Sequence, residues 1–82
     1  MIVKAPFITE KVTNMIDTNN TIEFLVDIRY SKPEIKKALE SLYDIEVVKV
    51  RTMITTTGEK KAIVKLAGDD SANELASRLG LL

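Results

Sequence analysis

The segment from Lys60 to Leu66 constrains the fold of this chain more than any other stretch of its sequence. Its residues alternate between an apolar set and a set that is mostly lysine, which is the two-residue period of a β-strand with one buried face. Another β-rich run, residues 45–54, precedes it across a short loop that contains Gly58, a residue suited to positive φ in a turn. The two runs predict a β-hairpin, and the 60–66 strand is expected inside the sheet.

The first third of the chain predicts a strand, a short helix and a second strand. Residues 2–4 read as a short edge strand ended by Pro6, which has no N–H to donate to a ladder. Thr9 is the expected N-cap of a helix with Glu10 in its first turn. Residues 21–28 then alternate as a half-buried strand, with an apolar side formed by Ile22, Phe24, Val26 and Ile28 and a polar side that includes Thr21, Glu23 and Asp27.

Two further helices carry recognisable start signals. Ser31 and Glu34 form a capping-box pattern. The apolar stripe expected to follow it on the core side of the helix is Ile35, Ala38, Leu39, Leu42 and Tyr43. Ser71 and Glu74 repeat the capping pattern before the last helix, and Gly80 is placed to end it.

Residues 45–54 form a strand whose two faces differ. Val48, Val50, Thr52 and Ile54 are expected to share one face. Ile45, Val47, Lys49, Arg51 and Met53 are expected on the other, which changes from apolar to basic along its length. One end of that second face is therefore expected to be covered and the other open.

The element order predicts an α+β layered domain over residues 1–82. Eighty-two residues leave room for one hydrophobic core. A strand-helix-strand connection usually returns parallel, so the 60–66 strand is expected to pair antiparallel with its hairpin partner and with residues 21–28. The predicted fold is a mainly antiparallel sheet of three to four strands with helices packed on it, similar in layering to ferredoxin-like domains.

Composition excludes several function classes. The chain has no cysteine and no histidine, which removes disulfides, thiolate nucleophiles, imidazole bases and the usual zinc ligands. Asp69 and Asp70 are adjacent before a helix, where capping explains them better than catalysis. We therefore expect no catalytic residues, no metal site and no cofactor. No apolar stretch is long enough to cross a bilayer and no signal peptide is evident, which predicts an intracellular protein without membrane insertion.

The distribution of charge indicates nucleic acid, although the formal net charge is zero. Residues 29–37 carry four basic side chains and one acidic one, and residues 49–65 carry five and one. Lysine and arginine neutralise phosphates and release counterions, and the threonines of residues 52–57 offer hydroxyl donors. One cationic face is expected, but an ordinary solvated hairpin explains the charge pattern alone better than phosphate contacts do. Base stacking on the sheet is disfavoured because the 60–66 strand has no aromatic residue.

Four segments in order resemble the large ribosomal subunit protein twenty-three family in its archaeal form. They are residues 6–11 (PFITEK), 31–38 (SKPEIKKA), 47–52 (VVKVRT) and 58–66 (GEKKAIVKL). The resemblance covers nearly the whole chain. It implies a cytoplasmic ribosomal protein that binds large-subunit ribosomal RNA near the polypeptide exit tunnel, next to other ribosomal proteins. It also implies part of the platform where the signal recognition particle, the translocon or chaperones dock, and no small-molecule substrate.

The resemblance assigns roles to particular side chains. The residues expected to contact RNA, with Thr55 included for its hydroxyl, are Lys11, Lys32, Lys36, Arg51, Thr52, Thr55, Lys60 and Lys61. Glu10 matches the glutamate that family members present to exit-site factors. The family often has asparagine where Arg51 stands, and the short loop at residues 55–58 differs from the long tunnel loop of bacterial members.

Two other function classes fit the sequence less well. A protein-protein interaction module without RNA would use the open edge of the sheet to add a strand from its partner. A small ferredoxin-like enzyme acting on acyl phosphates would need an arginine and an amide or carboxylate converging on a phosphate, and no such motif is evident.

Overall fold

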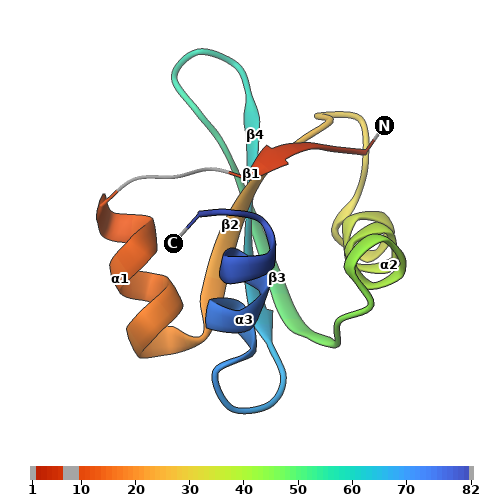
Figure 1. The fold of residues 1–82 in the computed structure, drawn as a ribbon. Helices are drawn as coiled ribbons and strands as arrows, with labels where there is room; N and C mark the ends of the chain where they lie inside the picture. The colour runs from red at the N-terminus through yellow and green to blue at the C-terminus, as the bar shows by residue number, and fades with distance from the viewer. Residues whose placement is uncertain (1, 7–9, 82) are drawn as a thin grey trace.

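The computed structural model describes residues 2–6 and 10–81, and for residues 10–13 and 17 it describes the backbone alone. Strands and helices follow one another along this part of the chain (Figure 1). They are β1 (Val3–Pro6), α1 (Glu10–Asn19), β2 (Thr21–Val26), α2 (Lys32–Tyr43), β3 (Val47–Ile54), β4 (Lys60–Leu66) and α3 (Ser71–Arg78).

Strand β4 lies inside an antiparallel sheet whose order in the described residues is β1-β2-β4-β3. It pairs with β2 from Thr21 opposite Lys65 to Val26 opposite Lys60, and with β3 on its other side. β2 and β3 are therefore parallel with β4 between them, so β2, α2 and β3 make a split β-α-β unit. The predicted α+β fold, with an antiparallel sheet, packed helices and the 60–66 strand in its interior, is confirmed.

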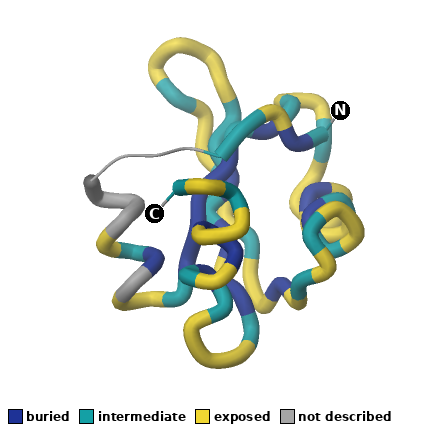
Figure 2. The backbone as a smooth tube through the Cα atoms, viewed as in Figure 1, coloured by how far each residue is buried: buried dark blue, intermediate teal, exposed yellow. Residues whose placement is uncertain are grey.

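The hydrophobic core lies between one face of the sheet and the helices. Figure 2 shows the buried backbone running along the central strands. The core residues are Val3, Ile16, Ile22, Phe24, Val26, Ile35, Leu39, Val47, Ala62, Val64, Leu66, Ala72, Leu75 and Ala76. The alternation of β4 is confirmed, because Ala62, Val64 and Leu66 are buried while Lys65 on the opposite face is exposed. We call that opposite face the open face.

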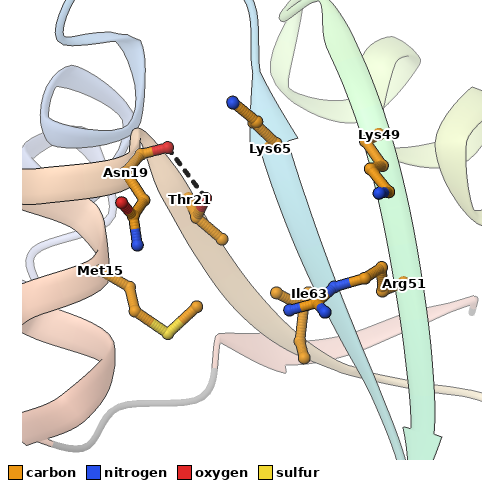
Figure 3. A pocket seen from close by; sticks show the side chains of 7 residues that line it. All are labelled: Met15, Asn19, Thr21, Lys49, Arg51, Ile63 and Lys65. Atoms are coloured by element: carbon orange, nitrogen blue, oxygen red, sulfur yellow. Dashed lines mark hydrogen bonds between the residues drawn. The ribbon is translucent and has the colours of Figure 1, made fainter.

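Strand β2 is more deeply buried than its alternating pattern predicts. Thr21 and Glu23, expected to be the polar side of a half-buried strand, are only 6% and 2% exposed. They lie on the open face, where α1 packs beside β2, and Figure 3 shows Thr21 next to Asn19 of that helix. Glu23 is paired with Lys61 of β4. Ile28, predicted to face the core, is 52% exposed because β2 ends at Val26 and the chain turns away. The prediction of a half-buried strand through residue 28 is therefore wrong.

A β-bulge in β3 brings Val47 into the core. Two residues of β3, Val47 and Val48, stand opposite the single residue Leu66 of β4, and the pairing shifts before Lys49. Val47 is 3% exposed whereas Val48 is 58% exposed. The prediction that Val48 shares a face with Val50 is wrong, because one extra residue reverses the alternation at the bulge. Beyond it the pattern holds, with Val50 packed against the core and Lys49 on the open face.

Helix α2 begins as its sequence predicts. Ser31 is the N-cap, and Oε1 of Glu34 accepts hydrogen bonds from the Ser31 N–H at 3.0 Å and from its Oγ at 2.9 Å. These bonds favour the carboxylate and lower the pKa of Glu34. Ile35 and Leu39 are buried, but Leu42, predicted to continue the apolar stripe, is 50% exposed. Tyr43, the last residue of the helix, returns to the core and stacks on Phe24 with 5.6 Å between the ring centroids.

Helix α3 begins one residue earlier than predicted. Asp70, not Ser71, is its N-cap, and Ser71 is the first helical residue. The Ser71 Oγ instead donates to the carbonyl of Ala67 at 2.6 Å. The Ser71 hydroxyl therefore bonds to the turn before the helix and does not have the capping role that the sequence pattern predicted.

Asn20 joins three elements through its side chain. Its Nδ2 donates to the carbonyls of Leu66 and Gly68, both at 2.8 Å, and its Oδ1 accepts the N–H of Ala72 at 2.7 Å. Asn20 has φ of 52°, in the left-handed region that asparagine tolerates better than most residues. One side chain thus ties the start of β2 to the end of β4 and to the first turn of α3.

We expect Asn20→Ala to lower the free energy of unfolding by about 3 kcal/mol, since three hydrogen bonds are lost and the positive φ becomes unfavourable. Thermal and urea unfolding of the full chain would measure this. Asn73→Ala is the control, because its amide makes a single exposed hydrogen bond to Asp70. Equal effects of the two substitutions would show that Asn20 does not hold the three elements together.

Candidate nucleic-acid interface

The structure divides the basic residues between two surfaces. Lys49, Arg51, Lys61 and Lys65 lie on the open face, where β3 and β4 pair side by side. Lys32 and Lys36 are exposed on α2, which packs on the other side of the sheet. The single cationic face expected from the charge blocks is therefore split in two.

Lysines of neighbouring strands lie directly opposite each other on the open face. Lys49 of β3 pairs with Lys65 of β4, and both are exposed. In the next row of the same face Arg51 pairs with Ile63. Like charges opposite each other destabilise a sheet, so the fold itself gains nothing from this arrangement. An anion bound beside the two lysines would offset this unfavourable pairing.

A cavity of about 260 Å³ opens beside these cations. Its lining residues are Met15, Asn19, Thr21, Lys49, Arg51, Ile63 and Lys65. Figure 3 shows the α1 side chains on one side of it and those of β3 on the other, with β4 between them. The Thr21 hydroxyl is already used, since its Oγ1 donates to the carbonyl of Asn19 at 3.0 Å. The cavity therefore combines cations, apolar groups and an amide.

Lys61 shares the open face but is held by a buried carboxylate. Its Nζ lies 3.1 Å from Oε1 of Glu23, and the two side chains are 19% and 3% exposed. That oxygen accepts no well-aligned hydrogen bond from the described residues, so the attraction is an ion pair whose alignment is poor. Glu23 and Lys61 are also staggered neighbours on adjacent strands, since Glu23 pairs with Ile63 and Leu25 pairs with Lys61. Lys61 has a structural role whatever else it contacts.

The basic residues near the start of α2 are also partly engaged. Nζ of Lys60 donates to the carbonyl of Tyr30 at 2.7 Å. Arg29 makes a two-pronged ion pair with Asp27, with nitrogen-oxygen distances of 3.0 and 2.9 Å. This guanidinium holds the pKa of Asp27 well below its usual range. Lys32, Lys36 and Lys37 are exposed on α2.

Two other predicted site residues, Thr52 and Thr55, have positions or contacts that differ from those of the open-face cations. Thr52 pairs with the buried Ala62 and therefore lies on the helix-covered face. The Thr55 hydroxyl is 3.0 Å from that of Thr57, and it accepts the N–H of Glu59 at 3.1 Å, so it stabilises the hairpin loop. The side chains of Glu10 and Lys11 lie outside the described residues. Their assigned roles stay predictions.

The cavity includes residues that sequence reasoning did not assign to a site. Met15, Asn19 and Ile63 were not candidates, whereas the charge pattern had suggested phosphate contact for Lys49 and Lys65. Met15 and Asn19 stand four residues apart on a helix and so share a face, which was the available signal. Their position across the cavity from β3 depends on packing that no local pattern encodes.

The described part of the chain contains neither a group of acidic residues that could bind a metal nor a membrane-spanning helix. Among its residues no group of three or more acidic side chains is placed to hold a metal ion. No helix that the structure describes is long and apolar enough to cross a membrane.

Comparison with known proteins gives the family. Residues 1–74 match the family model described as ribosomal protein L23. The chain is 48% identical over 80 residues to the large ribosomal subunit protein uL23 of Halobacterium salinarum, covering 98% of this chain and 95% of that protein. It is also 48% identical over 80 residues to the protein of that name from Haloarcula marismortui, covering 98% and 94% of the two chains. These matches confirm the resemblance noted in the sequence, and the chain belongs to the ribosomal protein L23 family.

Proposed function

We propose that this chain is a structural component of the large ribosomal subunit that binds large-subunit ribosomal RNA near the polypeptide exit tunnel. As a member of the ribosomal protein L23 family it is a ribosomal protein, part of a ribonucleoprotein, and not an enzyme. Both relatives described above are named as large-subunit proteins, which supports the assignment to that subunit. Its partners are then the RNA and neighbouring ribosomal proteins.

The observation that carries this proposal is the facing pair of exposed lysines, Lys49 and Lys65, with Arg51 in the next row. Three cations on two paired strands present a surface to which a phosphate backbone fits, and arginine adds two-pronged geometry. The interaction releases counterions and so depends on salt. Lys32 and Lys36 provide a second surface on α2, which suits RNA that contacts the protein from more than one side.

A second candidate function is protein recruitment by strand addition without RNA. The observation that favours it is the outer position of β3 in the sheet, with Val48, Met53 and Ile54 about half exposed or more along it. An unpaired strand edge can accept an extended segment of another protein. Binding of this kind would depend little on salt, which separates it from the RNA proposal.

The proposal is tested by binding the full chain to fragments that tile the large-subunit ribosomal RNA, across a salt series, with unrelated RNA as competitor. We expect saturable binding to particular fragments. Lys49→Gln, Arg51→Gln and Lys65→Gln should each weaken it and reduce the salt slope by about one for each phosphate that the variant no longer neutralises.

The matched control is Lys4→Gln, which removes the same charge from an exposed residue of β1 at the opposite edge of the sheet. It should leave affinity and slope unchanged. Competition by unrelated RNA at equal strength would contradict the ribosomal proposal. Binding of a protein partner in high salt, with no RNA binding, would favour strand addition.

Charge reversal at Lys61 is expected to affect folding before it affects RNA. Lys61→Glu places a second carboxylate beside buried Glu23 and should lower the free energy of unfolding by about 3 kcal/mol or more. Lys65→Glu is the matched control, since Lys65 is exposed on the same strand and the new carboxylate would lie opposite Lys49. Urea unfolding of both variants measures the difference. Equal stability would mean that the ion pair with Glu23 contributes little.

Docking of exit-site factors is a separate part of the proposal and rests on Glu10. Glu10→Ala should leave RNA affinity unchanged and weaken association of the signal recognition particle with ribosomes that carry the variant, because a recognised carboxylate is removed. Co-sedimentation of the particle with these ribosomes measures the effect. A fall in RNA affinity would instead assign Glu10 to the RNA interface.

A further inference from the structure

The cavity on the open face has two chemically different sides. Lys49, Arg51 and Lys65 supply cations from the strands, whereas Met15 and Ile63 supply apolar surface and Asn19 an amide. The Asn19 side chain is exposed and makes no hydrogen bond to the described residues. A phosphate backbone alone would use the first side and leave the second without a partner.

A nucleobase matches the second side of the cavity. The flat faces of a base can stack against aliphatic side chains or against the guanidinium of an arginine. The edge of the base carries hydrogen-bond donors and acceptors, and an amide can both donate to it and accept from it. Arg51 pairs with Ile63, so its guanidinium stands beside the apolar floor (Figure 3). The volume of about 260 Å³ is below the range of about 300–1,000 Å³ for drug-sized ligands, which suits one base rather than a stacked pair.

We infer that this cavity takes a single unpaired nucleotide of the bound ribosomal RNA. Its base lies between Met15 and Arg51 over Ile63, with its edge toward the amide of Asn19. Its flanking phosphates lie at Lys49 and Lys65, whose backbones pair across β3 and β4. This inference rests on the proposed RNA-binding function and adds to it the structural class of RNA, a strand with an extruded base rather than an uninterrupted duplex.

The position of α1 is what makes such a site possible without aromatic residues. Base-binding sheets usually stack bases on aromatic side chains, and β4 has none. Here the helix beside β2 supplies one wall and the guanidinium on β3 the other, so the base is enclosed from two sides of the open face (Figure 3). Specificity then comes from the amide and from the shape of the cavity.

The test uses the full chain and whichever large-subunit RNA fragment it selects in the salt series. Each unpaired nucleotide of that fragment is replaced in turn by an abasic residue, which keeps the phosphates and removes the base. We expect one position to lower affinity by about fivefold to a hundredfold, the range for removal of one stacked base. The salt slope should stay unchanged, since every phosphate keeps its cation.

Protein variants assign that position to the cavity. Asn19→Ala and Met15→Ala should weaken binding of the intact fragment and have little further effect once the critical base is absent. Asn14→Ala is the matched control, because Asn14 is an exposed asparagine of the same helix that does not line the cavity. Asn14→Ala should leave the affinity unchanged both for the intact fragment and for the fragment that lacks the critical base.

Three results would overturn the inference. If the chain binds its fragment selectively but no abasic position weakens binding, the cavity holds no base, and the proposed function stands. If one abasic position matters but its effect adds fully to that of Asn19→Ala, the base binds elsewhere on the protein. If the wild-type chain selects no fragment, the inference and the proposed function fail together.

Discussion

The pairing of β4 on both of its edges is the constraint on which the rest of the structure depends. Because β2 and β3 are both antiparallel to it, one register sets the side chains of three strands at once. Ala62, Val64 and Leu66 then enter the core, and the alternate residues are displayed on the open face. A shift by one residue would exchange the two sets, so the same ladder that forms the core also places the cations.

The bulge at Val47 and Val48 allows the start of β3 to face the core while the residue Lys49 faces the open side of the sheet. The start of the strand must cover the end of the core beside Leu66, whereas the following residues must carry charge on the open face. In a regular strand Val47 and Lys49 would share a face. The extra residue lets Val47 turn inward without moving Lys49 from the row that it shares with Lys65.

Local sequence patterns predicted the helices and strands well, but they predicted less well which side chains are buried and which are exposed. The alternation of β4, the capping box at Ser31 and the hairpin all follow from period and turn chemistry, and each is present. The bulge, the burial of Glu23 and the outward position of Leu42 depend on which element packs against which, and a two-residue or helical period does not contain that information. For the candidate site, charge indicated Arg51, but only the packing of α1 brings Met15 and Asn19 beside it.

The hydrogen bonds of Asn20 also help to hold the cavity together. They join residues that are 46 to 52 positions apart in the chain, and closing such loops is slow compared with forming a helix or a hairpin. Asn20 directly follows Asn19, so these long-range bonds also fix the end of α1, and with it the Asn19 side of the cavity, relative to residues 66–72.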